Sequence, residues 1–127
     1  MNIKMRLKSL WNKMIYHILS VEDWQNQAPG QPYRGDTLDT EGFIHCTGEV
    51  EWLLQVANRF YRASPANFVI LCIDPARVQA TVQWEAADQH IFPHIYGPLN
   101  LDAVVNVVQF PRAVTGQFVM PTELCKA

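Results

Sequence analysis

Cysteine, long apolar runs and basic charge beyond the first thirteen positions are all scarce in this sequence. Its 127 residues include three cysteines, Cys46, Cys72 and Cys125. Their odd number and spacing match neither a disulfide framework nor a zinc or redox motif, so we expect free thiols and a cytoplasmic protein. No apolar run approaches the roughly 20 residues that cross a bilayer, and no apolar stretch with a cleavage site follows the basic start. We therefore expect neither a membrane protein nor a secreted one.

The basic residues gather at the start of the chain. Four of the ten lysines and arginines lie within residues 1–13, and no acidic residue precedes Glu22. The remainder holds six basic against twelve acidic residues, a formal charge of −6. Because an acidic body is a poor partner for phosphate backbones, we expect no nucleic-acid binding. We interpret residues 1–13 as a dispensable basic extension, with a short helix lying on the domain as the alternative.

Apolar residues make up 49% of the sequence. At this length they can form one hydrophobic core but not two. We therefore predict a single domain over residues 14–118, preceded by the basic extension and followed by a C-terminal tail over residues 119–127.

The clearest predicted element is a long helix after Thr47. Its apolar residues recur at helical spacing and form one stripe: Val50, Leu53, Leu54, Ala57, Phe60 and Tyr61. Thr47 is a suitable N-cap, and Ser64-Pro65 ends the helix. Ser20, with Asp23 three residues later, predicts the N-cap of a shorter helix.

Runs rich in β-branched and aromatic residues predict strands over residues 14–19, 42–47, 67–74, 81–85 and 102–110. The third run is almost wholly apolar and should be buried on both faces. Turn-forming residues predict a loop over 28–36. Residues 92–98 predict either a rigid turn that packs aromatic rings into the core or a surface on which a ligand stacks. Five or six strands and one long helix, without strict alternation, predict an α+β fold.

His17 and His45 occur in matching contexts. Each lies on a short predicted strand that runs into a helix cap, Ser20 or Thr47. If the two strands pair, both imidazoles gather at one end of a sheet together with two helix N-termini, which favour an anion. A histidine on an apolar strand is more often structural, so that reading stays open for each of them.

His90 and His94 are four residues apart, the spacing of a metal pair on a helix. Pro93 and Gly97 argue against a helix here, so we expect no metal. The reference pKa of a histidine side chain, about 6.5, suits proton transfer at neutral pH, so His94 is a candidate general acid or base. Glu85 is either a general base or an exposed strand carboxylate.

Three motifs in order carry a resemblance to a known family. Tyr16-His17-Ile18, Glu41-Gly42-Phe43-Ile44-His45-Cys46-Thr47 and Phe92-Pro93-His94-Ile95-Tyr96-Gly97-Pro98 resemble a bacterial domain of unknown function, number 952, over residues 14–118. The resemblance implies an ADP-ribosyltransferase-like split β-sheet sandwich, with one long amphipathic helix and short flanking helices, that binds NAD between two small sheets. It also implies that the chain belongs to the branch that is similar to RNA 2′-phosphotransferases, in which the first two motif positions are histidines.

The resemblance also implies roles for single residues. His45 and His94 would be catalytic, with His45 at the nicotinamide ribose or a phosphate. His17 would bind the adenosine ribose, Thr47 and the helix N-terminus an anion, and Tyr33 or Tyr96 the nicotinamide ring. The third motif position of the superfamily is often a glutamate, but this sequence has none near His94. The resemblance therefore does not imply that this protein ADP-ribosylates other proteins. The acidic body likewise argues against an RNA substrate.

We therefore expect a protein that binds a small nucleotide, NAD or an ADP-ribosyl nucleotide, as its substrate and transfers or cleaves ADP-ribose. Two alternatives stay open. One is an inactive nucleotide-sensing or partner-binding module. The other is a metal-assisted hydrolase that uses His90 and His94.

Overall fold

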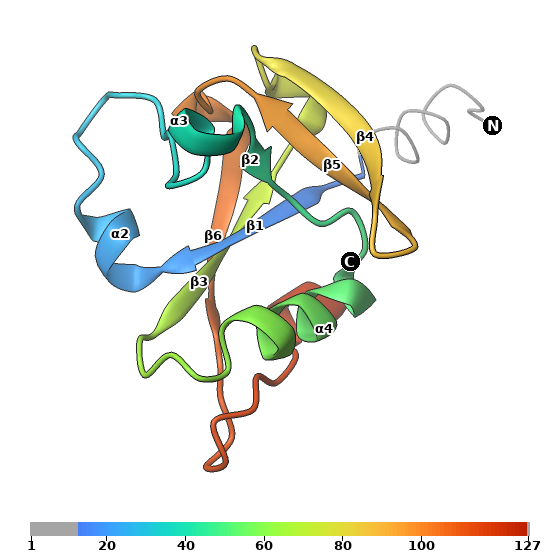
Figure 1. The fold of residues 1–127 in the computed structure, drawn as a ribbon. Helices are drawn as coiled ribbons and strands as arrows, with labels where there is room; N and C mark the ends of the chain where they lie inside the picture. The colour runs from blue at the N-terminus through green and yellow to red at the C-terminus, as the bar shows by residue number, and fades with distance from the viewer. Residues whose placement is uncertain (1–12, 127) are drawn as a thin grey trace, which may run out of the picture.

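The structure is a computed structural model that describes residues 13–126 (Figure 1). The extension expected over residues 1–13 lies, except for its last residue, outside the described residues. Six strands form two three-stranded antiparallel sheets, with strand orders β1-β3-β6 and β2-β5-β4. The prediction of an α+β fold is confirmed.

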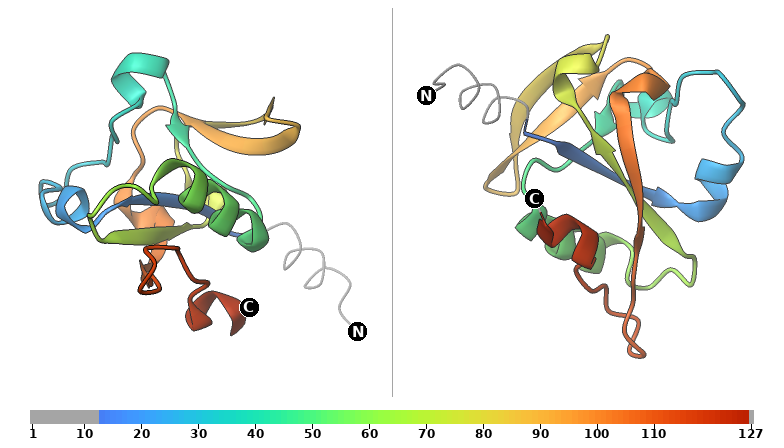
Figure 2. Two further views of the ribbon diagram at one scale, coloured as in Figure 1. Left: turned by 60° about the horizontal axis from the view of Figure 1, so that its bottom comes forward. Right: turned by 180° about the vertical axis from the view of Figure 1, so that it is seen from behind.

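The first sheet contains β1 (Ile15–Ser20), β3 (Phe68–Ile73) and β6 (Val104–Phe110). The central strand β3 is buried at every position, as its apolar run predicted. One face of this sheet packs against the second sheet, and the other packs against the long helix (Figure 2). Both faces of β3 are therefore shielded from water.

The second sheet contains β2 (Ile44–His45), β4 (Thr81–Ala87) and β5 (His90–Tyr96). The expectation of a rigid turn over residues 92–98 was wrong, because most of that stretch belongs to the central strand. Pro93 is tolerated there because its main-chain groups face β2 where that strand ends. Cys46 donates its N–H to the Pro93 carbonyl at 3.1 Å, and proline has no N–H to return.

The two sheets meet where β2 stops. Thr47 leaves the second sheet and bonds to Tyr16 of β1, with N···O distances of 2.7 and 2.8 Å. Residues 44–47 therefore pair first with β5 and then with β1. This confirms in part the expected pairing of the two histidine strands, which meet at this bridge but belong to different sheets.

Within residues 13–126, three α-helices connect the strands. The helix α2 (Val21–Gln25) begins at Ser20, whose hydroxyl accepts the Asp23 N–H at 3.0 Å as predicted. The helix α3 (Leu38–Glu41) was not predicted. The helix α4 (Val50–Phe60) matches the predicted stripe and buries Leu53 and Ala57. Its N-cap is Glu49 and not Thr47, because the chain extends two residues beyond the bridge to β1 before it turns.

The C-terminal residues pack onto the domain. They form a short 3-10 helix at Thr122–Lys126. Two other 3-10 helices, Pro75–Arg77 and Leu101–Ala103, lie earlier in the chain. Pro121 and Leu124 are buried, and Leu124 joins the core beside α4 (Figure 2). The tail expected from residue 119 onwards is thus part of the domain. Among residues 13–126, no helix has the length and apolarity needed to cross a membrane.

Candidate functional site

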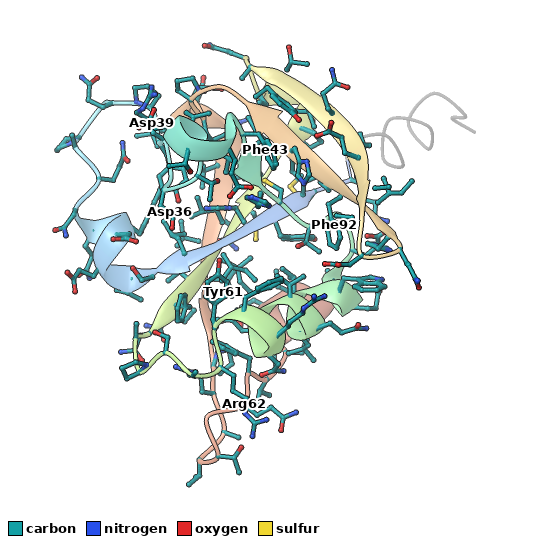
Figure 3. The ribbon with its side chains drawn as sticks, in the orientation of Figure 1. Asp36, Asp39, Phe43, Tyr61, Arg62 and Phe92 are labelled. Atoms are coloured by element: carbon teal, nitrogen blue, oxygen red, sulfur yellow. The ribbon has the colours of Figure 1, made fainter. Side chains whose placement is uncertain are left out.

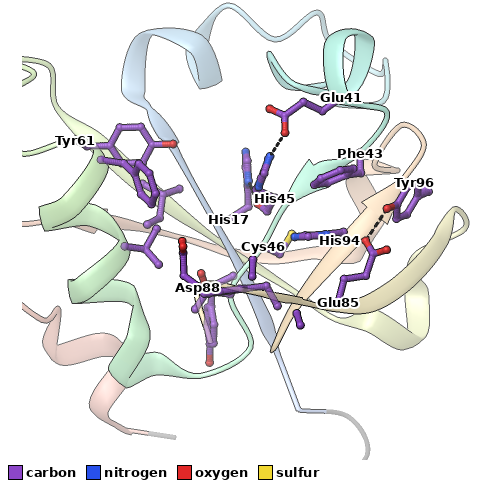
Figure 4. A pocket seen from close by; sticks show the side chains of 18 residues that line it. His17, Glu41, Phe43, His45, Cys46, Tyr61, Glu85, Asp88, His94 and Tyr96 are labelled. Atoms are coloured by element: carbon purple, nitrogen blue, oxygen red, sulfur yellow. Dashed lines mark hydrogen bonds and ion pairs between the residues drawn. The ribbon is translucent and has the colours of Figure 1, made fainter. Parts of the chain in front are cut away.

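Two adjoining cavities form a cleft between the sheets and α4. The first, of about 510 Å³, lies among β1, β2, the β4–β5 hairpin and the C-terminal half of α4 (Figure 4). The second, of about 740 Å³, extends over α2 and the loop that follows it. His17, Ile18, His45 and Tyr61 line both cavities. The cleft is therefore continuous, with these four residues at its middle.

His17 is bonded inside the protein at both ring nitrogens. Its Nδ1–H donates to the His45 carbonyl at 2.6 Å, because a carbonyl can only accept. Its Nε2 must then accept, and the Tyr33 hydroxyl donates to it at 2.8 Å. Burial lowers the pKa of His17, so the ring is neutral at pH 7. A ligand can reach its ring surface, but both nitrogens already serve the fold.

Tyr33 lines the second cavity but is largely buried. Its side chain is 6% exposed, and its ring meets Trp24 edge-on. Burial also raises the pKa of its hydroxyl, which stays protonated as a donor to His17. Tyr33 therefore holds His17 in place from the wall of the second cavity, and its contact with a nicotinamide ring stays a prediction.

His45 is the accessible histidine of the pair. Its side chain is half exposed, and Nε2 lies 3.1 Å from the Glu41 carboxylate. Thr47 is buried and holds the bridge to β1 with its main chain. The part of α4 that lines the cleft is its C-terminal half, through Val56 and Phe60. Thr47 lines the first cavity, but the end of α4 that lines it is the C-terminal one, which does not favour an anion. The anion site expected at Thr47 and the helix N-terminus stays a prediction.

His94, Glu85 and Tyr96 form a bonded cluster in the first cavity (Figure 4). The His94 Nδ1 lies 2.8 Å, and the Tyr96 hydroxyl 2.5 Å, from the same oxygen, Glu85 Oε1. These hydrogen bonds, from Tyr96 and then from His94, lower the pKa of Glu85. The bond to Glu85 in turn raises the pKa of Tyr96. Glu85 is thus a carboxylate that holds two donors.

The His94 ring is fixed on its remaining sides as well. It stacks on Phe43 with a centroid separation of 4.1 Å and meets His45 edge-on at 5.3 Å. Its side chain is 8% exposed. Nε2 has no hydrogen-bond partner among the described residues. Every fully buried side-chain nitrogen of these residues does have such a partner. Nε2 must therefore keep solvent-accessible surface, and His94 lines the cavity.

His90 lies apart from this cluster. Its ring stacks on Trp52 at 4.0 Å, and Nε2 bonds to Glu49 at 3.0 Å. Since His90 and His94 lie on one strand, four residues separate them by about 13 Å. Residues 13–126 hold no group of three histidine, cysteine or acidic side chains that could bind a metal. The spacing of these two histidines therefore does not create a metal pair.

The floor of the cleft carries main-chain groups that the fold leaves unused. On an antiparallel strand, alternate residues direct their N–H and C=O to opposite sides. Tyr16 directs its own groups away from β3 and toward Thr47, so Ile18 must also face away from β3. No partner for the Ile18 N–H or C=O occurs among the described residues. One peptide donor and one peptide acceptor thus face the cleft.

Acidic groups dominate the electrostatics of the cleft. Glu41, Glu85 and Asp88 line the first cavity. Among the described residues that line either cavity, Arg34 is the single arginine or lysine, and it pairs with Asp39 at 2.6 Å. The first cavity therefore favours a cationic or neutral group, and Arg34 marks where an anion is best tolerated.

One protein-family model matches most of this chain. The model of the family described as "Protein of unknown function (DUF952)" matches residues 18–107. The chain belongs to the DUF952 family. No curated protein matches this DUF952 chain.

The X-ray structure of CC0527 from Caulobacter crescentus is similar to this DUF952 protein. The TM-score is 0.75 at 25% identity, over 88% of this chain and 98% of that one. A solution NMR structure of CC0527 gives a TM-score of 0.67 at 28% identity, over 82% and 90% of the two chains. The likeness supports the α+β fold over almost its full extent.

The structure adds to the site of this DUF952 chain one residue, Tyr61, that the sequence analysis assigned to the core, and one contact, between Glu85 and His94, that it did not predict. Tyr61 ends the apolar stripe of α4, and helical spacing alone marks such a residue as core (Figure 3). Glu85 meets His94 because Gln83 is opposite His94 in the β4–β5 register, which places the two side chains diagonally on one face. The alternating pattern of β4 together with a pairing register could have indicated this contact.

Proposed function

We propose that this DUF952 protein binds NAD, or a closely related ADP-ribosyl nucleotide, with the nicotinamide end in the first cavity. The two small packed sheets agree with the ADP-ribosyltransferase-like split sandwich that the sequence motifs imply. The cleft between the sheets and α4 supports the proposal with space for a nucleotide.

The observation that carries the proposal is the pair of unused main-chain groups on Ile18. A primary carboxamide has one N–H donor pair and one carbonyl acceptor on the same carbon. It can bond to the N–H and C=O of a single peptide residue, as a neighbouring strand would. Nicotinamide carries this group.

The charge of the first cavity supports the same orientation. The nicotinamide ring of NAD is a pyridinium cation, and the carboxylates of Glu41, Glu85 and Asp88 line the space, Asp88 being paired with Arg59 at 3.1 Å. Phe43 and Tyr61 add aromatic surfaces, which attract a flat cation through their electron-rich faces. His45 would then lie near the adjoining ribose, and the pyrophosphate and adenosine would extend toward Arg34 in the second cavity.

A thermal-shift titration tests this proposal. NAD at 100 times its dissociation constant should stabilise the protein by about 2.7 kcal/mol. Nicotinic acid adenine dinucleotide is the matched probe, because its carboxylate cannot donate to the Ile18 carbonyl and is repelled by the acidic cavity. We expect a shift with NAD and little or none with the acid. No shift with NAD or ADP-ribose would refute nucleotide binding, and equal shifts with the two dinucleotides would refute the role of Ile18.

A further inference from the structure

His94 is almost fully buried, yet it keeps one nitrogen available to the first cavity. Its side chain is 8% exposed, and only Nδ1 has a partner among the described residues, Glu85 at 2.8 Å. Every fully buried side-chain nitrogen of those residues has a hydrogen-bond partner, so Nε2, which has none, cannot be fully buried. It must be reachable from the cavity that His94 lines.

We propose that His94, oriented by Glu85, is a general base that activates water against the nicotinamide–ribose bond of bound NAD, so that the protein hydrolyses NAD to nicotinamide and ADP-ribose. This inference rests on the proposed binding of NAD in the cleft. It adds a reaction, a base and a positioning residue to that binding.

The geometry around His94 fixes the tautomer that a base requires. The ionised Glu85 carboxylate can only accept, so the proton of the neutral ring resides on Nδ1 and the lone pair on Nε2. Phe43 stacks on the ring and blocks its rotation. The Tyr96 hydroxyl donates to the same carboxylate oxygen as His94 does and holds it in place. The cluster is therefore preorganised before any ligand arrives.

The reaction balances with these groups alone. The water oxygen forms a bond to C1′ of the ribose, and its proton passes to His94 Nε2. The C1′–N bond breaks, and its electron pair returns to the pyridinium nitrogen, which leaves as neutral nicotinamide. Glu85 stabilises the imidazolium, which then loses its proton to solvent. Because the leaving group needs no proton, the site requires a base and no acid.

Water is the acceptor that fits this site. The His94 imidazole lies recessed at 8% exposure behind Phe43 and His45. The side chain of a protein acceptor would have to enter a cavity that the nicotinamide ribose already occupies. A water molecule needs only the space beside Nε2.

The experiment measures nicotinamide release by chromatography and NAD binding by thermal shift on the same full-length samples. The wild type should do both. His94→Asn keeps a donor at the Nδ1 position but lacks Nε2, so we expect kcat to fall at least about 100-fold. Its KM and NAD shift should stay unchanged. His90→Asn is the matched control on the same strand and should release nicotinamide at the wild-type rate.

Because Glu85 acts through His94, its variants must be tested with a measurement that would stay unchanged if Glu85 only stabilised the fold. Glu85→Gln should lower kcat about 10–100-fold, with a smaller rise in KM because the first cavity loses one carboxylate, and should abolish the far-downfield proton resonance of the His94–Glu85 bond. Glu85 is 42% exposed, so this variant carries the test if His94→Asn does not fold. Full activity of either variant would overturn the inference, as would a wild type that binds NAD without releasing nicotinamide. That last result would leave the proposed binding intact, whereas absence of NAD binding would refute both.

Discussion

The Tyr33 hydroxyl donates to Nε2 of His17 at 2.8 Å, and both side chains are less than a tenth exposed. The bond ties the loop after α2 to the floor of the cleft. Tyr33→Phe would leave a buried nitrogen without its donor, and we expect a loss of about 1–3 kcal/mol in the free energy of unfolding. Urea denaturation measures this loss. Tyr96→Phe is the control, because Tyr96 is 39% exposed and water can replace its partner. Equal losses in the two variants would contradict this account.

His17 should also make the stability depend on pH. Burial lowers its pKa from 6.5, so the unfolded chain takes up a proton first as the pH falls. The contribution of His17 is thus present above about pH 6.5 and lost below it. Between pH 7.5 and 5.5 the wild type should lose up to about 1.4 kcal/mol more than His17→Asn. Parallel denaturation curves at the two pH values test this. The lowered pKa of Glu85 acts only below its ordinary value of 4.5 and does not interfere.

The amide of Ile18 can be removed without breaking the sheet. Its N–H faces away from β3, so Ile18→Pro keeps the β1–β3 hydrogen bonds. We expect the variant to fold with reduced stability and to lose the thermal shift produced by NAD. Ile18→Val, which keeps the N–H and removes one methylene, should lose about 0.5–1.5 kcal/mol and respond to NAD normally. An unchanged NAD response in the proline variant would exclude recognition through this peptide group.

Arg112 terminates α4 from a distant part of the chain. Its guanidinium donates to the carbonyls of Tyr61, Arg62, Ser64, Ala66 and Gly116. Lysine cannot reproduce this fork, so Arg112→Lys should cost at least about 2 kcal/mol in urea denaturation. Arg59→Lys is the control, because its ion pair with Asp88 is exposed and should be worth about 0–1 kcal/mol. Equal costs would show that the lysine satisfies the same carbonyls.

The sequence predicted those parts of the fold that local patterns decide. Helical spacing located α4, the all-apolar run located β3, and Ser20 with Asp23 located the start of α2. The same reasoning failed over residues 92–98, where it predicted a turn, because long-range pairing makes most of this stretch part of β5. Proline and glycine there indicate a turn, but Pro93 lies opposite the end of a short strand, and no local pattern reports where that strand ends.

The site was predicted in part for the same reason. Motif spacing singled out His45 and His94, and the β2–β5 register places them directly opposite each other. It also suggested a ligand-binding role for His17 and left a structural role open, and the bonds to Tyr33 and the His45 carbonyl show the structural role. Which residue bonds to a histidine depends on contacts across the fold, and periodicity contains no information about them.

The segment Ile44–Thr47 pairs with β5 at its beginning and with β1 at its end. The main chain of this one segment therefore hydrogen-bonds the two sheets to each other, in addition to the apolar core that they share. His45 lies within the segment, and its carbonyl is bonded to His17 of β1, so the segment that joins the sheets also fixes the separation of the two histidines. The centre of the cleft is thus held by main-chain hydrogen bonds, whereas Phe60 and Tyr96 are 60% and 39% accessible at its exposed rim.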